Sequence, residues 1–248
     1  MQLSEDEKLD LLDQYRNDED LELGDKQFEV LRELAFDEDS YIRSEVAALL
    51  VNYPTMAAKD LLLRLAQDHD WFTRLQAYDS LSHFHIKEVQ DFLVNALQHE
   101  HNTPARGYII LSLADIGADL CKDHEAQLPK IKRAAARARS PRTKLSYCYM
   151  LYCFGDPDIL QEWLSYLNYP EPYVKCWVIA GMYDVIDEGN AALITGAIKK
   201  LLQKEEDDDV RETAQTFLER YQDAAAHNDV CKLGTRDDTY LSEAHPGR

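Results

Sequence analysis

Hydrophobic residues recur at fixed distances after six basic residues, which we call anchors. In all six cases, positions 3, 7 and 10 after the anchor are apolar or aromatic. Steps of three and four residues place such positions on one face of an α-helix. The sequence therefore predicts a core-facing helix after each anchor. The anchors are Arg43, Arg74, Arg106, Lys144, Lys175 and Arg211.

Short polar turns precede the anchors, as in DEDSYIR (37–43) and DHDWFTR (68–74), and a second helical pattern precedes each turn. Each repeat is therefore predicted to be a helix A, a turn and a helix B. Side chains in the turns that accept hydrogen bonds are expected to cap the B helices. These predicted caps are Asp39, Asp70, Asn102, Ser140 and Asp209.

The D-x-D-x-x-x-R turn followed by an Ala- and Leu-rich helix resembles the HEAT repeat, especially the short bacterial form related to phycobilisome-lyase-type repeats. The resemblance covers about residues 25–221 and is weakest in the fourth repeat, which lacks the turn acid. It implies an all-α fold, a right-handed α-solenoid of about six helix pairs. Helix pairs of this size bury their apolar faces only by stacking. Each anchor is expected to pair across the stack with a turn acid.

The chain ends differ from the repeats. Residues 1–24 are predicted to form an N-terminal cap helix, because Ser4 and Glu7 have the spacing of a capping box. Residues 25–221 form the predicted repeat solenoid. Residues 222–248 have no periodic apolar pattern and are predicted to be a C-terminal tail, with Val230, Leu233 and Tyr240 as side chains that could dock on the last repeat.

Charge narrows the classes of partner. The chain has 27 Lys and Arg against 46 Asp and Glu, a net charge of −19. A surface of this sign repels phosphate and anionic membranes and favours basic partners, so we expect no nucleic acid and no membrane as a ligand. Five cysteines without a C-x-x-C pair and the lack of a secretory signal pattern predict reduced thiols and a cytoplasmic location.

One basic segment, KIKRAAARARSPRTK (130–144), contrasts with the acidic chain. The register places most of it on the outer face of the fourth A helix. Its cations are expected to be held against acidic neighbours such as Glu125. The alternatives are a contact with an acidic part of a partner or of a second copy, and a nucleic-acid site.

Catalytic and metal-binding motifs are not found. There is no G-x-S-x-G, P-loop, H-E-x-x-H or G-x-G-x-x-G sequence. Five histidines cluster between residues 69 and 101, but the register spreads them over different turns and opposite edges. We therefore predict no metal site and no cofactor. The clustered histidines are His69, His83, His85, His99 and His101.

The family resemblance implies that B helices line the concave side of a solenoid. Positions 1, 5, 8 and 9 after each anchor point away from the core, and position 2 points sideways. In the middle repeats these positions carry aromatic rings and acids, a composition typical of binding hot spots. The alternative is that neighbouring B helices bury these rings. The predicted partner-binding residues are Asp79, Tyr108, Leu111, Asp115, Tyr149, Tyr152, Trp177, Tyr183 and Asp184.

These patterns favour a non-enzymatic module whose acidic, Tyr-rich concave face binds a basic protein. A more specific hypothesis is an immunity protein that neutralises a nuclease toxin by imitating its nucleic-acid substrate. The alternative is a bilin-lyase-like or other HEAT-repeat enzyme. The family resemblance implies this class, but no catalytic motif of such enzymes maps onto this sequence. The oligomeric state is left open.

Overall fold

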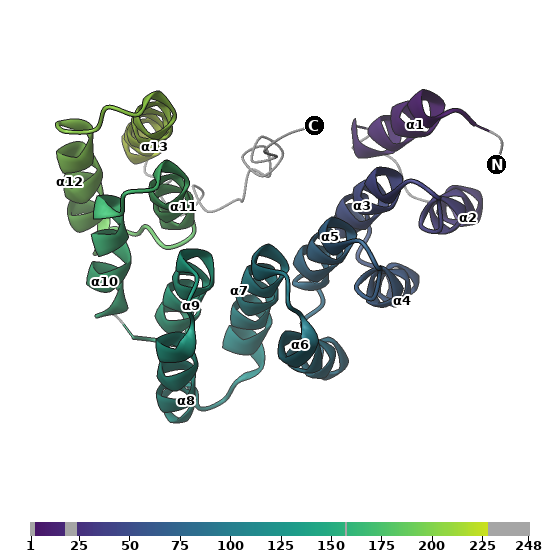
Figure 1. Cartoon of the computed structure of the whole chain (residues 1–248), viewed down its shortest axis with the longest axis horizontal. Coiled ribbons are helices and arrows are strands. Elements are labelled where there is room, and N and C mark those ends of the chain that lie inside the picture. Colours follow the sequence, from purple (N-terminus) through teal and green to yellow (C-terminus); the bar gives the residue numbers. More distant parts are fainter. Residues whose placement is uncertain (1–2, 18–23, 157, 228–248) are drawn as a thin grey trace. The chain divides into compact units, whose positions relative to one another are not determined.

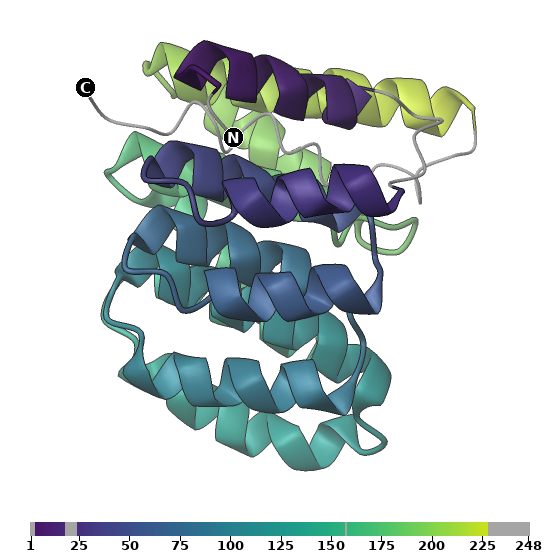
Figure 2. The same ribbon diagram turned by 90° about the vertical axis from the view of Figure 1, so that its right-hand side faces the viewer.

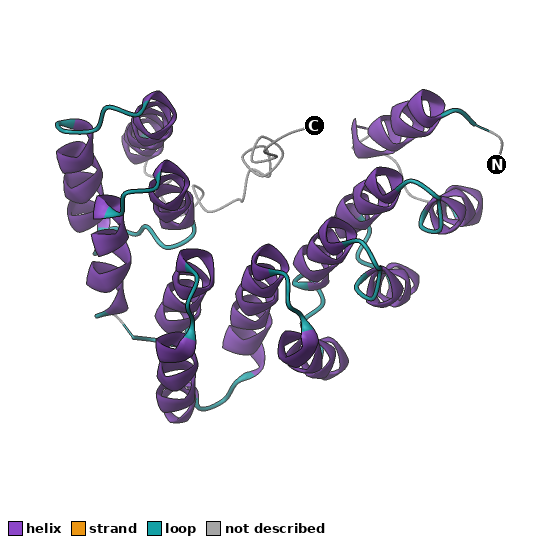
Figure 3. Cartoon of the chain, viewed as in Figure 1, coloured by secondary structure: helices purple, strands orange, loops and turns teal. Residues whose placement is uncertain are grey.

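The computed structural model describes residues 3–17, 24–156 and 158–227. Helices joined by loops make up this described part, which contains no β-strand (Figure 3). The chain divides into two compact units, Met1–Asp156 and Pro157–Arg248. The predicted all-α class is confirmed, and the predicted repeat region 25–221 is shared between the two units.

The first unit contains one helix followed by four A–B pairs, and the second unit contains two pairs (Figure 1). The single helix is α1 (Glu5–Asn17), and the first four pairs are α2 (Asp25–Leu34) with α3 (Ser40–Leu49), α4 (Met56–Leu65) with α5 (Trp71–Leu81), α6 (Lys87–His99) with α7 (Thr103–Leu120), and α8 (His124–Arg137) with α9 (Pro141–Cys153). The remaining pairs are α10 (Ile159–Ser165) with α11 (Pro172–Tyr183), and α12 (Ala191–Leu202) with α13 (Asp208–Ala226); 3₁₀ turns follow α3 at Leu50–Asn52 and α10 at Tyr166–Asn168.

Within the first unit, the B helices form one layer in which α3 packs on α5, α5 on α7 and α7 on α9. Each A helix packs against its own B helix, so the A helices form the second layer (Figure 1). Seen from the side, α2, α4 and α6 lie one above another in sequence order (Figure 2). A B helix therefore has packed neighbours on three sides.

Burial follows the anchor register. Of the eighteen positions predicted to face the core, sixteen are buried, and Tyr53 and Tyr221 are half-buried. Glycine allows the closest approach in the B layer: a Cβ on Gly107 of α7 would lie 3.1 Å from the Ser146 hydroxyl of α9. Serine hydroxyls also join neighbouring B helices, since Ser80 donates to the Ala47 carbonyl and Ser112 to the Tyr78 carbonyl, both at 2.8 Å.

The anchors form a ladder of ion pairs along the A–B turns. Arg43 binds both carboxylate oxygens of Asp68 at 2.7 and 2.8 Å, and Arg74 binds Glu100 at 2.7 and 3.0 Å. In the second unit Lys175 binds Glu205 at 2.7 Å. Each acid belongs to the turn of the following repeat, so the predicted pairing across the stack is confirmed for these three anchors.

The same arginines hold their own turns. The Nη1 atom of Arg43 donates to the carbonyls of Asp37 and Glu38 at 2.8 and 3.1 Å. The Nη1 atom of Arg106 donates to the carbonyls of Leu97 and Glu100 at 2.6 and 2.8 Å. One guanidinium thus satisfies carbonyls of its own turn, and Arg106 also satisfies the Leu97 carbonyl near the C-terminal end of its A helix.

Helix α1 joins the ladder at its N-terminal end. Lys8 pairs with Asp37 at 2.5 Å, and α1 packs on α3 in the place that a preceding B helix would take. The Ser4–Glu7 capping box is present, with the Ser4 amide donating to Glu7 at 2.8 Å and the Glu7 amide donating to the Ser4 hydroxyl at 3.3 Å.

Four of the five predicted caps accept hydrogen bonds from the first turn of their B helices: Asp39, Asp70, Asn102 and Ser140. The prediction for Asp209 is wrong. Asp207 caps α13 and accepts a hydrogen bond from the Val210 amide at 3.1 Å. The cap lies four residues before the anchor in every one of these repeats, and this register selects Asp207 from the acidic run.

At the C-terminal end, α13 continues to Ala226, five residues beyond the predicted limit of the repeats at 221. Residues 228–248, with Val230, Leu233 and Tyr240, lie outside the described part of the chain. Among the described helices, none has both the length and the apolar composition that crossing a bilayer requires.

Replacing Arg74 with Met is expected to lower the free energy of unfolding by about 3 kcal/mol, because the buried Glu100 would lose its cation. The matched control is Arg106→Met. Arg106 occupies the same register position and holds turn carbonyls, but it has no carboxylate partner among the described residues, so its loss should cost about 1 kcal/mol. Urea denaturation followed by circular dichroism compares the two. Equal losses would show that the carbonyl contacts, and not the ion pair, stabilise the turn.

Candidate functional site

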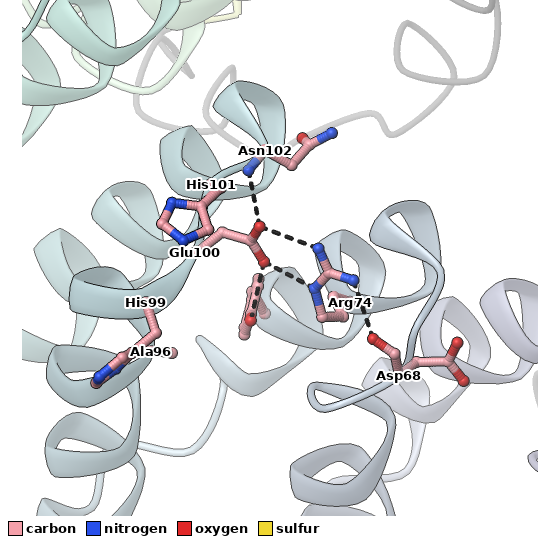
Figure 4. A pocket seen from close by; sticks show the side chains of 8 residues that line it. Asp68, Arg74, Ala96, His99, Glu100, His101 and Asn102 are labelled. Atoms are coloured by element: carbon pink, nitrogen blue, oxygen red, sulfur yellow. Dashed lines mark hydrogen bonds and ion pairs between the residues drawn. The ribbon is translucent and has the colours of Figure 1, made fainter.

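A cavity of about 350 Å³ opens at the A–B turns of the second and third repeats. Figure 4 shows that Glu100 lies between Arg74 and the Asn102 amide at this cavity. His99 lies apart from this pair, at the end of α6. The residues that line the cavity are Asp68, Arg74, Tyr78, Ala96, His99, Glu100, His101 and Asn102.

The charged groups at this cavity already form ion pairs and hydrogen bonds within the chain. Burial alone would raise the pKa of the Glu100 carboxyl, but hydrogen bonds from Arg74 and the Asn102 amide hold that pKa below its usual value. Burial, together with the Glu100 charge, raises the pKa of Tyr78 to about 12. At neutral pH Glu100 is therefore ionised and fully bonded, which makes it a structural ion and a poor general base.

Of the five clustered histidines, His99 and His101 line this cavity and the other three do not. His69 and His101 lie in successive turns, whereas His83 and His85 follow the C-terminal end of α5, where His85 pairs with Asp119. In the part of the chain that the structure describes, no three His, Cys, Asp or Glu side chains are close enough to share a metal ion.

Five of the predicted partner-binding residues lie on the B helices of the first unit and are half-buried: Asp79, Leu111, Asp115, Tyr149 and Tyr152. The Tyr149 hydroxyl donates to the Asp115 carboxylate at 2.5 Å, which joins α9 to α7. The sequence pattern therefore brings a tyrosine and an acid together on one face of this layer.

Tyr108 requires a correction, because only 4% of its surface is exposed. Its ring lies under Arg142, whose guanidinium carbon is 5.5 Å from the ring centre. Position 2 after an anchor lies against a neighbouring B helix, as Tyr108 lies against α9 and Ser146 against α7, so a side chain there is covered. Tyr108 contributes to packing between α7 and α9 and is not exposed to a partner.

The other three predicted residues, Trp177, Tyr183 and Asp184, belong to the second unit and are also half-buried. Trp177 packs edge-on against Tyr173 with ring centres 5.5 Å apart. The ring centres of Tyr183 and Phe217 are 4.7 Å apart. The guanidinium carbon of Arg220 lies over the Tyr183 ring, 5.9 Å from its centre. A binding role for these residues stays a prediction.

Exposed aromatic rings lie instead at A–B turns: Tyr173, 51% exposed, lies at that of the fifth repeat in the second unit, and three others lie at those of the first two repeats. The exposed fraction is 62% for Phe36, 47% for Tyr41 and 37% for Trp71. We call these three residues the aromatic edge. The Thr73 hydroxyl donates to the Ser40 carbonyl at 3.1 Å, so the first turns of α5 and α3, which carry Trp71 and Tyr41, adjoin each other.

The periodicity after the anchors does not predict the aromatic edge, because Phe36, Tyr41 and Trp71 precede the anchors. Both turn motifs carry an aromatic residue two or three positions before the anchor, in SYIR and DWFTR. Ile42 and Thr73 on these first turns are buried, so Tyr41 and Trp71 are exposed because they lie on the side of the turn that neighbouring helices do not cover. Nearby acids shape this surface: the Glu45 charge, burial and Asp13 raise the pKa of Tyr41, against the opposing effect of Arg16.

Comparison with known proteins agrees with the repeat assignment. Residues 28–117 match a family model described as HEAT repeats. The matched segment begins in α2 and ends in α7, so it covers the first three A–B pairs. No curated protein matches the chain. The finer resemblance to phycobilisome-lyase-type repeats stays a prediction.

Acid should weaken the fold through the turn carboxylates. The pKa values of Asp37, Asp68, Glu100 and Glu205 are all lowered in the folded chain, where cations offset the effect of burial. Such groups bind fewer protons folded than unfolded. Their stabilisation is therefore complete above the unfolded pKa of about 4 and is lost as the pH falls through the folded values.

We expect the thermal midpoint to fall steeply between about pH 5 and pH 3. Glu100→Gln should be less stable than the wild type at pH 7 but should lose less stability over that interval, because one titrating group is gone. Thermal melts at several pH values measure both. A difference between the two proteins that stays constant from pH 7 to pH 3 would contradict the role of Glu100.

Proposed function

Because this chain contains HEAT repeats, we propose that it is a non-enzymatic protein-binding module and that its partner is a basic protein. HEAT repeats form helical scaffolds that are often used for protein interaction. The further steps, a basic partner and the surface that it contacts, rest on the charge and the exposed side chains of the first unit.

The aromatic edge is the observation that carries this proposal. Phe36, Tyr41 and Trp71 expose large rings on adjoining turns, where folding alone would favour polar side chains. Tyrosine and tryptophan are enriched among residues that dominate binding energy at protein interfaces. Exposed rings gathered at one edge support a contact with another protein.

Charge selects the type of partner. Residues 1–117, which include the aromatic edge, carry 24 Asp and Glu against 10 Lys and Arg. The ladder uses Asp37, Asp68 and Glu100, and most of the remaining acids face solvent. A lysine or arginine from a partner can contact the face of a ring and a nearby carboxylate together. The surplus of acids would also speed encounter with a basic protein.

The half-buried residues of the B layer extend the proposed surface. Asp79, Leu111, Asp115, Tyr149 and Tyr152 lie on α5, α7 and α9, and each retains an accessible part. The hydrogen bond between Tyr149 and Asp115 orients both groups before a partner arrives, which reduces the entropy lost on binding. In this proposal these residues form the rim of the interface, and the aromatic edge makes the contacts that contribute most of the binding energy.

A basic nuclease toxin is the partner class that we propose within this function, with the chain acting as its immunity protein. Acidic side chains that imitate phosphates would cover the DNA- or RNA-binding surface of such an enzyme. We place this function in the cytoplasm. In support, no disulfide joins the cysteines in the described part of the chain, as is usual in reducing compartments: Cys121, Cys148, Cys153 and Cys176.

The double variant Tyr41→Ala/Trp71→Ala is expected to bind its partner about 30-fold or more weakly, since truncation of an aromatic hot spot typically costs about 2 kcal/mol. Affinity capture from the producing cell, with wild type and variant as parallel baits, identifies proteins that depend on the edge. Titration of each purified partner then measures affinity, which should fall as salt rises.

Met56→Ala is the matched control, because Met56 is a 60% exposed apolar residue of the same unit at the start of an A helix. Its affinity should equal that of the wild type. Partners that are acidic, or that bind the double variant and wild type equally, would overturn the proposed surface. A nuclease assay tests the finer step: a captured basic nuclease that stays fully active when bound would rule out the immunity role. Stoichiometric binding of a bilin would instead favour the enzyme alternative.

A further inference from the structure

The basic segment of the fourth repeat presents three cations in a line on α8. Lys130, Arg133 and Arg137 are all exposed. Their spacing of three and then four residues places them within a 60° sector of the helix, over a length of about 10 Å. We call these three residues the basic stripe.

The basic stripe lacks ionic partners within the described part of the chain. Lys130 makes a side-chain contact only with Gln127, at 3.4 Å, and no carboxylate lies within ion-pair distance of Arg133 or Arg137. Only Lys132, on another side of the helix, forms an ion pair, with Asp156 at 2.6 Å. The expectation that acidic neighbours such as Glu125 hold these cations is therefore wrong for the stripe.

Helix α8 is also the least buried helix of the first unit. It contains no buried residue and packs mainly on α9. Its Ala-rich sequence and the Asp123 cap, which accepts from the Ala126 amide at 3.0 Å, favour the helix without requiring a covered face. The stripe thus lies on a helix that buries no side chain and packs mainly on α9.

The opposite end of the same unit carries a matching acidic line. Asp6, Asp10 and Asp13 of α1 are exposed and are spaced by four and then three residues. They lie on the side of α1 away from the buried Leu12 and Tyr15. We call them the acidic stripe; within the chain, Asp13 also forms an ion pair with Arg16 at 2.9 Å. When the two helices run antiparallel, Lys130 faces Asp13, Arg133 faces Asp10 and Arg137 faces Asp6, with identical spacing.

We propose that the basic stripe on α8 binds the acidic stripe on α1 of a second copy of this chain. The residues around each stripe add to the match, since residues 118–156 carry eight Lys and Arg against four Asp and Glu, the reverse of residues 1–117. A long polyanion such as DNA would be attracted by the stripe but repelled by the adjoining acidic repeats. A second copy also carries these acidic repeats, so what favours it as the occupant is the matching spacing of its acidic stripe.

This contact joins two different surfaces, so it is heterologous and leaves a free stripe at each end of the assembly. Growth should therefore continue with concentration and should not stop at a dimer. Exposed ion pairs are individually weak and screened by salt, so association should require low ionic strength and protein concentrations of tens to hundreds of micromolar.

Sedimentation velocity of the full chain tests the proposal. In about 20 mM salt the weight-average sedimentation coefficient of the wild type should rise with concentration, and in about 500 mM salt it should not. Arg133→Glu/Arg137→Glu and Asp6→Lys/Asp10→Lys should each abolish the rise. The chain with all four substitutions should regain it, because the charges are exchanged between the stripes.

Lys199→Glu/Lys200→Glu is the matched control, with the same change in net charge at two exposed lysines of α12 in the second unit. It should associate as the wild type does. Absence of association by the wild type at low salt, or failure of the four-fold variant to restore it, would overturn the proposal. A wild type that stays monomeric but binds a 20-base-pair duplex through Arg133 and Arg137 would identify the stripe as a nucleic-acid site instead.

Discussion

The ion pair between an anchor and the turn acid of the next repeat is the contact on which the repeat stack depends. One guanidinium donates to a backbone carbonyl of its own A–B turn and binds a carboxylate of the following turn, as Arg43 and Arg74 do. That carboxylate also accepts an amide of its own turn, as Glu100 does from Asn102. Turn conformation and repeat spacing are thus set by the same few atoms.

The places where this ladder stops explain the least regular parts of the fold. Ala138 occupies the acid position of the fourth repeat and Tyr169 that of the fifth. Without these carboxylates, Arg106 holds only carbonyls, α8 buries no side chain, and the division into two units falls between the fourth and fifth repeats. Apolar burial holds α9 in place there: Leu145, Tyr147 and Leu151 are buried, and Gly107 lets α7 approach α9 at Ser146.

The acidic surplus has two separable roles. A few carboxylates form the ion pairs of the ladder. Because their pKa values are lowered in the folded chain, the fold loses stability when acid protonates them. The others remain at the surface, where they favour a basic partner beside the exposed rings of the first two repeats. The cations of α8 take no part in the ladder, and they give the first unit a basic surface beside its acidic repeats. An acidic chain can therefore present surfaces for two kinds of contact.

The sequence by itself determined the helix pairs, their register and the pairing of anchors with turn acids, because these follow from periodicity and from contacts one repeat apart. It also indicated where rings gather along the chain. Only the tertiary structure decided which rings are exposed. Tyr108 is buried and Tyr149 half-buried because each B helix is covered by the B helices before and after it, whereas Tyr41 and Trp71 lie on the uncovered side of their first turns. Helical periodicity describes one helix at a time, and exposure depends on its neighbours.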